Sequence, residues 1–257
     1  MGTPDVSPAI STPYIFGSSV IGPLHVQLNT PCQDACSFRS LPCNAAAIVV
    51  CDGLGSASKS DVGARLAANA AVETAQNMLV DPGLSGAEIV RTAVRAARRS
   101  LEAKAAEDQC PLRDLACTII IVVARKDELA VAHIGDGAVV ALTENGLQLV
   151  SGPGESEYSN EVTPLTSSKW EDDLRLSSVI TGVRCVAVFT DGCQRAAFRK
   201  SPDRVEPFEG FFCPIFAYAN ERQDLSEAER EIQSLLMSKK LCENSEDDKT
   251  LVVAVLS

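Results

Sequence analysis

Five acidic turns in this sequence directly adjoin apolar runs, and their carboxylates are the side chains best suited to do chemistry. The turns are Gln33-Asp34, Asp52-Gly53, Gly135-Asp136-Gly137, Asp191-Gly192 and Asp247-Asp248. One such turn carries little information, because Asp-Gly turns are common in loops. Five turns that each adjoin a strand of one layered core can bring their carboxylates into a single cluster.

A cluster of carboxylates indicates a site for hard divalent cations. Carboxylates that lie close together repel one another and raise each other's pKa unless cations neutralise them. Ligand sets made only of oxygen favour Mg²⁺ or Mn²⁺ over zinc or copper. Two such ions about 4 Å apart can bridge a water, lower its pKa and hold a phosphoryl oxygen for attack.

The stretch from Ala45 to Gly63 is the element that must position the second turn. Its apolar run leads into Cys51 and stops at Asp52, after which an alanine-rich helical pattern begins. A continuous apolar run is typical of a strand buried on both faces, so Asp52 is expected at a sheet end, where loops place chemistry on a rigid scaffold. We expect Gly53 and Gly55 to adopt backbone conformations closed to other residues.

Apolar periodicity predicts three helices, at about residues 60–79, 86–107 and 226–241. Ser58 or Ser60 is the expected N-cap of the first helix, and Ser226 and Glu229 are the expected capping box of the third. The first helix is rich in Ala, Val and Leu on nearly all its faces. That composition predicts close packing against a flat surface.

Strands are predicted over residues of about 14–20, 45–51, 116–125, 128–134, 138–144, 147–150, 183–189 and 249–256. Asn145-Gly146 between two of these runs is a strong hairpin signal. Tight connections between consecutive strands predict antiparallel pairing and an α+β fold, not an alternating βαβ fold. Residues 151–182 form a long polar excursion of the kind that shapes a site or lid.

Charge and composition restrict the class of protein and of partner. The 257 residues carry 34 acidic and 23 basic side chains, and the net charge of −11 argues against nucleic acid or an anionic membrane as a partner. No apolar segment is long enough to span a membrane, and the N-terminus lacks the features of a signal peptide. We therefore expect a cytoplasmic protein, monomeric, with a loose segment at 1–12 and a single domain over 13–257.

The ten cysteines are predicted to be reduced, because most lie inside apolar runs. Cys32, Cys36 and Cys43 could supply three zinc ligands. No fourth Cys or His lies nearby at a familiar spacing, so zinc is the less favoured interpretation.

The order of the motifs and their residues resemble those of the metal-dependent protein serine/threonine phosphatases of type 2C, in a divergent bacterial form. The resemblance runs from about Gly17 to Leu256 through CQDA, VVCDGLG, CTIIIVV, HIGDG, VFTDG and DDKT. Each motif alone is weak, but their joint order is specific. The resemblance implies a four-layer α-β-β-α sandwich, with two central antiparallel sheets flanked by helices and a binuclear metal site at one end.

The resemblance also implies ligands for two Mg²⁺ or Mn²⁺ ions. Asp52 resembles the carboxylate that bridges both ions, and Gly53 the residue that offers its carbonyl to one of them. Asp191 and Asp247 resemble ligands of the other ion.

Two more aspartates resemble family residues at the edge of this centre. Asp34 resembles the residue that holds metal-bound water, and Asp136 resembles a ligand of a weaker third metal site. Arg195 stands four residues after Asp191, where the family usually has another aspartate for that third ion. Arg195 could neutralise Asp136 through its planar guanidinium, or it could begin a solvated helical face.

Several positions depart from the family pattern. Gln33 replaces an acidic residue, and Asn29 replaces the arginine that binds the substrate phosphate. His25 is the candidate substitute for that arginine. Leu54 stands where a general-acid histidine is often found, and Asp248 stands where asparagine is usual.

The implied activity is hydrolysis of phosphoserine or phosphothreonine in phosphoprotein substrates. A water activated by two metals attacks directly, without a phosphoenzyme, which agrees with the absence of a DxDxT motif. The missing arginine motivates the alternative, a catalytically silent module that keeps the fold and binds within a signalling complex.

Overall fold

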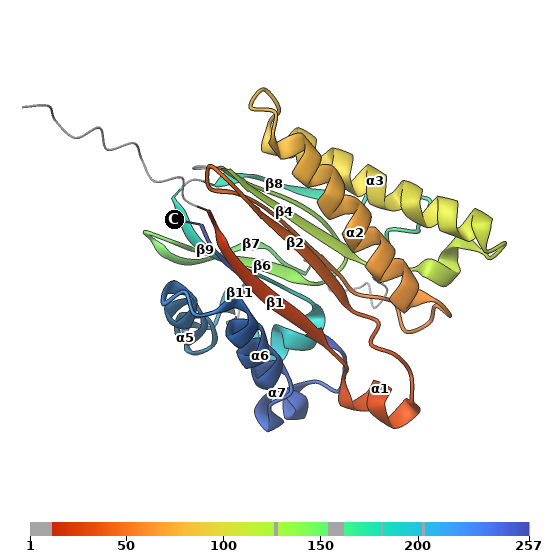
Figure 1. Cartoon of the computed structure of the whole chain (residues 1–257). Coiled ribbons are helices and arrows are strands. Elements are labelled where there is room, and N and C mark those ends of the chain that lie inside the picture. Colours follow the sequence, from red (N-terminus) through yellow and green to blue (C-terminus); the bar gives the residue numbers. More distant parts are fainter. Residues whose placement is uncertain (1–11, 126–127, 154–161, 181, 202–203, 257) are drawn as a thin grey trace, which may run out of the picture.

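The computed structural model describes residues 12–125, 128–153, 162–180, 182–201 and 204–256. Two five-stranded antiparallel sheets pack face to face, and helices cover both outer sides (Figure 1). This arrangement is the α+β, four-layer α-β-β-α sandwich that the motif order implied, and that prediction is confirmed. Of the expected loose segment at 1–12, residues 1–11 lie outside the described residues.

The first sheet has the strand order β2-β3-β4-β5-β8. Its strands are β2 (Ala35–Leu41), β3 (Ala45–Cys51), β4 (Ile119–Arg125), β5 (Glu128–Ile134) and β8 (Arg175–Ile180). Its outer face is covered by α2 (Ser60–Leu79) and α3 (Gly86–Glu107), and the short helix η1 (Leu112–Leu115) leads back into β4.

The second sheet has the strand order β1-β12-β9-β6-β7. Its strands are β1 (Tyr14–Val20), β12 (Lys249–Val255), β9 (Val183–Phe189), β6 (Ala138–Thr143) and β7 (Gly146–Ser151). Its outer face is covered by α5 (Glu209–Asn220), α6 (Leu225–Leu236) and α7 (Lys239–Asn244).

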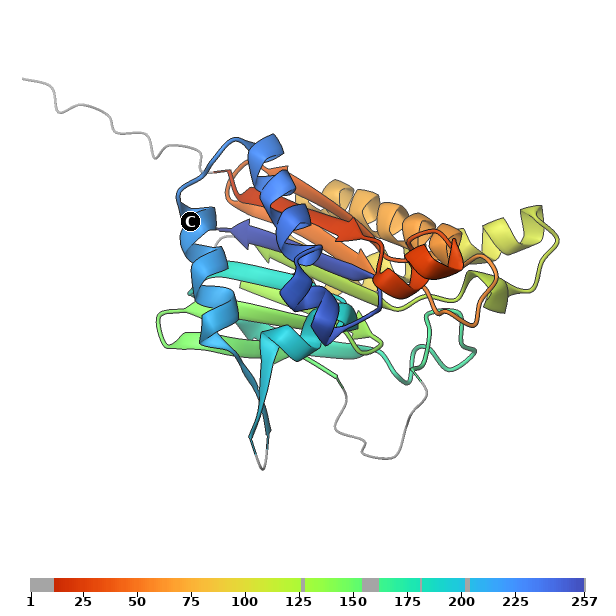
Figure 2. The same cartoon turned by 90° about the horizontal axis from the view of Figure 1, so that it is seen from below.

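Three smaller features complete the described chain. After β1 comes the short helix α1 (Pro23–Leu28), and after β9 come η2 (Asp191–Cys193) and α4 (Gln194–Ala197). The hairpin of β10 (Phe198–Ser201) and β11 (Arg204–Pro207) projects away from the sandwich (Figure 2). The excursion predicted as polar loop thus contains β8. The helical face that Arg195 could begin extends only to Ala197, where β10 follows.

The core is divided into three apolar layers because each sheet is covered on both faces. Strand β3 shows the pattern: Val49 packs with α2 and α3, while Ile48 and Val50 pack against the second sheet. All seven residues of β3 are buried. The predicted strand buried on both faces is confirmed, and Asp52 follows it at the sheet end.

Helix α2 lies close to the first sheet because small side chains face it. Ala64, Ala68 and Ala71 are buried in that layer. A Cβ added at Gly63 would lie 2.1 Å from the carbonyl oxygen of Leu115, so only glycine fits there. The close packing predicted from the alanine-rich sequence is confirmed.

The predicted helix caps are wrong at two positions. The residue preceding α2 is Lys59, and neither Ser58 nor Ser60 caps the helix. Helix α6 is capped by Asp224, whose carboxylate accepts the Ser226 N–H at 3.0 Å. A carboxylate outcompetes the serine hydroxyl as an acceptor because it is charged. The predicted third helix also divides at Met237 into α6 and α7.

No helix in the described part of the chain is long and apolar enough to cross a membrane. All ten cysteines are free in the structure.

Candidate metal centre

Three aspartates from three different connections converge at one end of the sheets. Asp52 follows β3, Asp136 lies between β5 and β6, and Asp191 follows β9. One carboxylate oxygen from each lies within 4.8 Å of the others. The turn at Asp136 passes from one sheet to the other, so the three carboxylates meet where the two sheets end together.

The surroundings of these carboxylates disfavour their charged forms. Burial raises the pKa of Asp52 well above its usual range, and repulsion from Asp34 and Asp191 adds to the effect. Burial, with repulsion from Asp136 and Asp247, raises the pKa of Asp191 to about 6. Neutralisation by a nearby cation would remove this penalty.

An orphaned oxygen tests whether a cation fits this centre. The Oδ1 atom of Asp191 is buried and has no hydrogen-bond partner among the described residues. A buried acceptor without a partner costs about 1–3 kcal/mol. Because the group is an oxygen beside two other carboxylates, a hard divalent cation satisfies it. The donor set therefore fits Mg²⁺ or Mn²⁺.

The backbone of Asp52 is fastened on both sides. Its N–H donates to the Thr118 hydroxyl at 3.0 Å, and its carbonyl accepts the Thr118 N–H at 2.7 Å. The next N–H, from Gly53, donates to the carbonyl of Gln33 at 3.1 Å. These contacts hold the turn between the start of β4 and the segment before β2.

Glycine is needed at position 53 for space and not for an unusual backbone conformation. A Cβ there would lie 2.8 Å from both the Gln33 carbonyl oxygen and the Ser60 side chain. Neither Gly53 nor Gly55 has a positive φ. The prediction that these glycines use conformations closed to other residues is wrong.

Asp34 is buried beside the centre. Its Oδ2 accepts hydrogen bonds from the Thr190 hydroxyl at 2.8 Å and the Thr250 hydroxyl at 2.7 Å. Burial raises its pKa to about 8, although those two hydrogen bonds oppose the shift. Both threonines lie at the site end of β9 and β12, so Asp34 ties the segment before β2 to the second sheet.

A cavity of about 260 Å³ opens over the carboxylates. It is lined by Leu24, His25, Gln33, Asp52, Gly53, Leu54, Gly55, Thr118, Asp136, Val162 and Asp247. His25 is the only basic side chain of this lining, which contains no Lys or Arg. Asn29, where the family has its arginine, ends α1 in a left-handed conformation and does not line the cavity.

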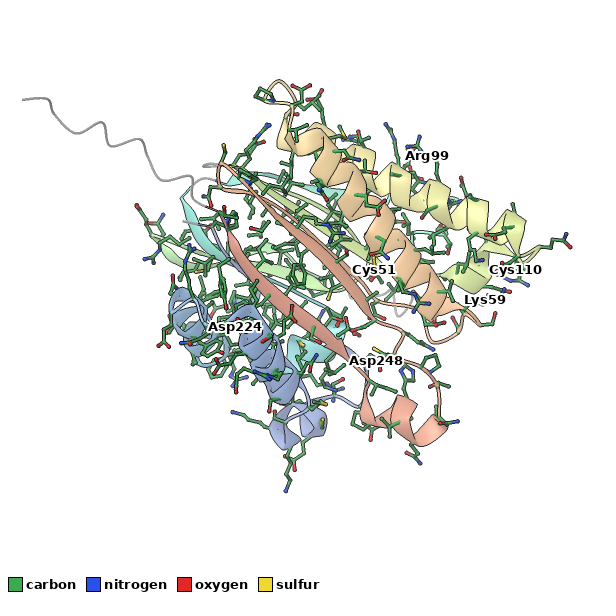
Figure 3. The ribbon with its side chains drawn as sticks, in the orientation of Figure 1. Cys51, Lys59, Arg99, Cys110, Asp224 and Asp248 are labelled. Carbon is green, nitrogen blue, oxygen red and sulfur yellow. The ribbon has the colours of Figure 1, made fainter. Side chains whose placement is uncertain are left out.

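Asp248 anchors one wall of this cavity beside α1 (Figure 3). Its two oxygens accept the Gly22 N–H and the Gln33 N–H, both at 2.6 Å. The Nδ1 atom of His25 lies 2.9 Å from the Oδ2 atom of Asp248. His25, Asp247 and Asp248 form a second group whose potential ligand atoms lie within 4.8 Å of one another.

Arg195 does not approach Asp136. Its Nη1 donates to the carbonyl of Asn244 at 3.1 Å on the exposed surface, so the proposed neutralisation of Asp136 by Arg195 is wrong. The guanidinium near Asp136 belongs to Arg175, which donates to the adjacent Gly135 carbonyl. Burial raises the pKa of Asp136 and Arg175 lowers it. No sequence pattern pointed to Arg175, because β8 lies within the polar excursion.

The described fold and site can be compared with known proteins. The sequence profile described as protein phosphatase 2C matches residues 21–237. The chain belongs to the protein phosphatase 2C family. It is 32% identical over 247 residues to another protein, serine/threonine-protein phosphatase 3 of Escherichia coli (strain K12), covering 93% of this chain and 96% of that one.

Solved structures share the phosphatase 2C fold with this chain. The serine/threonine phosphatase PstP/Ppp of Mycobacterium tuberculosis has a TM-score of 0.64 at 15% identity, over 96% of this chain and 100% of that chain. The catalytic domain of PstP in complex with 2 manganese ions has a TM-score of 0.63 at 17% identity, over 95% and 98% of the two chains. Family membership favours a metal-dependent serine/threonine phosphatase over the catalytically silent module.

Proposed function

We propose that this phosphatase 2C member hydrolyses phosphoserine and phosphothreonine in phosphoproteins, using two Mg²⁺ or Mn²⁺ ions at the joint end of its sheets. The observation that carries the proposal is the convergence of Asp52, Asp136 and Asp191 within 4.8 Å. A silent module would have no need to keep this costly cluster of half-buried carboxylates.

Four residues would hold the ions. Asp52 would be the carboxylate shared by both ions, and Gly53 would offer its carbonyl to one of them. Asp191 and Asp247 would bind the other ion. Asp191 lies in the carboxylate cluster with Asp52, and Asp247 lines the cavity together with Asp52. Bound ions supply charge stabilisation of the phosphoryl oxygens and lower the pKa of water.

Asp34 orients the attacking water. Its Oδ2 is occupied by Thr190 and Thr250. No described residue donates a hydrogen bond to its Oδ1 that would compete with a water there. Because both threonines belong to the second sheet, the direction of this carboxylate is fixed before substrate arrives.

Asp136 contributes to a weaker third ion. Its carboxylate shares the cluster with Asp52 and Asp191, and the nearby charge of Arg175 already offsets part of its own. The third ion is therefore expected to bind more weakly than the other two.

His25 holds the substrate phosphate in place of the absent arginine. It lines the cavity, and its Nδ1 faces the Asp248 carboxylate at 2.9 Å, which leaves Nε2 available. Asp248 itself is fixed by the Gly22 and Gln33 N–H groups. The imidazole thus lies at ion-pair distance from a carboxylate whose own position is determined, although its Nδ1 forms no hydrogen bond there.

Charge restricts the partners. A net charge of −11 disfavours nucleic acid and anionic membranes. The similarity to a serine/threonine-protein phosphatase supports phosphoproteins as the substrates, and we propose that the protein acts as a monomer in the cytoplasm.

The test is phosphate release from a phosphoserine peptide and from p-nitrophenyl phosphate after complete removal of metal. We expect release only when Mn²⁺ or Mg²⁺ is restored, and its loss on adding EDTA. The control is Asp172→Asn, an exposed aspartate outside both clusters, which should behave as the wild type. No release with either ion, from protein that still gains thermal stability from them, would establish the silent module instead.

A further inference from the structure

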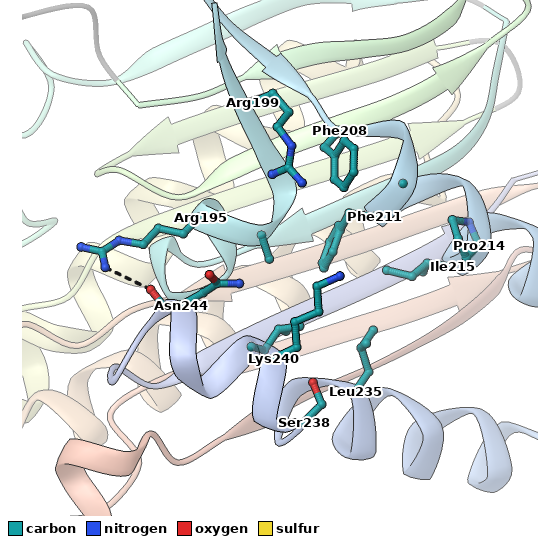
Figure 4. Close-up of a pocket in the computed structure, with 13 residues that line it drawn as sticks. Arg195, Arg199, Phe208, Phe211, Pro214, Ile215, Leu235, Ser238, Lys240 and Asn244 are labelled. Carbon is teal, nitrogen blue, oxygen red and sulfur yellow. Dashed lines mark hydrogen bonds between the residues drawn. The ribbon is translucent and has the colours of Figure 1, made fainter.

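A second cavity, of about 330 Å³, lies between α4, β10, α5 and the α6–α7 segment (Figure 4). None of its lining residues lines the metal cavity. Its apolar part is formed by Phe208, Phe211, Pro214, Ile215, Leu235 and Leu241. A volume of this size suits one large apolar side chain or a small ligand, since ligand cavities begin at about 300 Å³.

Three cationic side chains line this cavity and no acidic ones do. They are Arg195, Arg199 and Lys240, which come from α4, β10 and α7. Within the described part of the chain, none of the three forms an ion pair with a carboxylate. This local positive charge stands out in a chain whose net charge is −11.

The arginines are held in place by neutral groups, so their charge stays available. Arg195 donates to the Asn244 carbonyl at 3.1 Å, and Arg199 donates to the Phe198 carbonyl at 3.2 Å. The Arg199 guanidinium also lies 3.5 Å from the centroid of the Phe208 ring. A cation over an aromatic face keeps its charge while losing little freedom.

The lining also offers a backbone acceptor. Pro214 lies inside α5 and has no N–H. The carbonyl of Gly210, four residues earlier, therefore lacks the helical donor that position 214 would supply. Gly210 and Pro214 both line the cavity. A carbonyl without its helical partner can accept an N–H from a ligand backbone.

We propose that this cavity docks an acidic peptide segment of a partner protein. One apolar side chain enters the cavity, and flanking Asp or Glu carboxylates meet the three cations. Figure 4 shows the three charged groups at separate positions around the cavity. That separation suits carboxylates spaced along a peptide better than one compact anion, and the carbonyl of Gly210 suits a peptide N–H.

Fluorescence anisotropy with a labelled peptide, Ac-EELFEE-amide, tests the proposal. Binding is measured on metal-free Asp52→Asn protein, so that its outcome does not depend on catalysis. We expect saturable binding that weakens with salt. Ac-KKLFKK-amide and Ac-EEGGEE-amide, which lack the charge or the apolar side chains, should bind at least tenfold more weakly.

Charge reversals then locate the binding site. Lys240→Glu and Arg199→Glu should each weaken binding of the acidic peptide at least tenfold. The matched control is Lys239→Glu, which makes the same change of charge on α7 at an exposed lysine outside the cavity, paired with Glu243 at 3.7 Å. Its binding should change less than threefold. If a reversal fails to fold by circular dichroism, Lys240→Gln or Arg199→Gln replaces it, with the same expected direction.

Four results would overturn the proposal. The acidic peptide could bind no better than the basic one, or Lys239→Glu could weaken binding as much as Lys240→Glu, which would indicate bulk charge alone. Inorganic phosphate could displace the peptide from wild-type protein at concentrations near the dissociation constant of phosphate itself. That result would indicate a simple anion site. Sedimentation could show a dimer that Lys240→Glu dissociates, which would assign the cavity to a second copy of the chain.

Discussion

Asp52 combines a rigid backbone with a carboxylate whose charge is unfavourable without metal. The backbone is fixed by Thr118 and by the Gly53–Gln33 contact. The side chain is half-buried beside Asp191 and Asp136. A residue of this kind serves function at the expense of stability, because the same carboxylates repel one another when no cation is present.

The substitution Asp52→Asn should therefore separate activity from stability. We expect Mn²⁺-dependent hydrolysis to fall by about 100-fold or more, since even loss of groups that only support metal ligands costs about 10–100-fold. The melting temperature of metal-free protein should not fall, because one repelling charge is removed. Differential scanning calorimetry in EDTA and a p-nitrophenyl phosphate assay give the two readouts. Full Mn²⁺-dependent activity in the folded variant would rule out the bridging role.

His25 is predicted to act on substrate binding. His25→Ala should raise KM for p-nitrophenyl phosphate about tenfold, corresponding to about 1.4 kcal/mol, with little change in metal affinity. Val26→Ala is the matched control, since Val26 lies on the same short helix, is exposed and does not line the cavity. An unchanged KM in His25→Ala would leave substrate phosphate to the metals alone.

Asp248 should respond differently from His25. In Asp248→Asn only one oxygen remains to accept the Gly22 and Gln33 N–H groups. One donor is left without its partner, which costs about 1–3 kcal/mol. We expect a lower melting temperature together with a raised KM, whereas His25→Ala should affect KM only. Wild-type thermal stability in Asp248→Asn would show that the two contacts are replaceable.

Sequence reasoning located the aspartates because each ends or opens an apolar strand. Asp52, Asp136 and Asp191 are brought together, and Asp247 lines the same cavity. Arg175 could not be found in this way, because no acidic turn adjoins it and it lies within the polar excursion at 151–182. Arg195 was assigned by its spacing from Asp191, but spacing along the chain does not fix side-chain direction, and the guanidinium lies toward Asn244.

At the scale of elements, long and strongly periodic segments were the most predictable. Helix α3 begins and ends at Gly86 and Glu107 as expected, because one of its faces is continuously apolar. Strand β8 was missed because its serines and arginine break the apolar pattern at a sheet edge. The β10–β11 hairpin was missed because the stretch RAAFRK has a helical composition. In the structure, the backbone of residues 198–201 pairs with residues 204–207.

The packing of α2 gives a prediction with an unusual sign. Replacing an exposed helical glycine by alanine normally stabilises a helix by about 1 kcal/mol. At Gly63 the new Cβ would lie 2.1 Å from the Leu115 carbonyl oxygen. We expect Gly63→Ala to lower the free energy of unfolding by about 1–3 kcal/mol, as overpacking does.

Urea denaturation of wild type and Gly63→Ala measures the difference. Activity should fall too, since displacing η1 moves the segment that carries Thr118 and hence the backbone of Asp52. Stabilisation by alanine would show that the backbone yields at this contact.

At the scale of the whole molecule, the carboxylate cluster makes stability depend on pH and metal together. Asp34 and Asp191 have pKa values raised to about 8 and about 6, against about 3.9 for an unfolded aspartate. At pH values between the unfolded pKa of about 3.9 and these raised folded pKa values, the folded state binds more protons than the unfolded state. The free energy of unfolding therefore falls as pH rises through this range. Metal-free protein should therefore melt at a lower temperature at pH 8 than at pH 5.

Divalent metal should reverse that trend. At a hundredfold excess over its dissociation constant, a bound ion adds about 2.7 kcal/mol, and it binds better at pH 8, where fewer protons compete. Melting curves at both pH values, with EDTA and with Mn²⁺, give the comparison. Identical curves with EDTA and Mn²⁺ at pH 8 would mean that the carboxylates do not share a cation.

The partition of strands between sheets could not be derived from periodicity. The strands at 116–150 follow one another with short connections, yet β4 and β5 belong to one sheet and β6 and β7 to the other. A turn of three residues at Gly135 to Gly137 makes that change of sheet, and Gly135 has a φ of 114° there. Motif order supplied the two-sheet architecture, because local pattern does not determine which strands pair.

The pairing of β1 with β12 has a consequence for how the protein is made. Among the described strands β1 comes first and β12 last, and Tyr14 pairs with Val255. Since domains begin to fold as they leave the ribosome, β1 and β9 must wait for the strand that lies between them. Asp248 directly precedes β12, so its contacts with Gly22 and Gln33 form only then. The cavity that Asp247 lines can therefore be completed only after β12 has been synthesised.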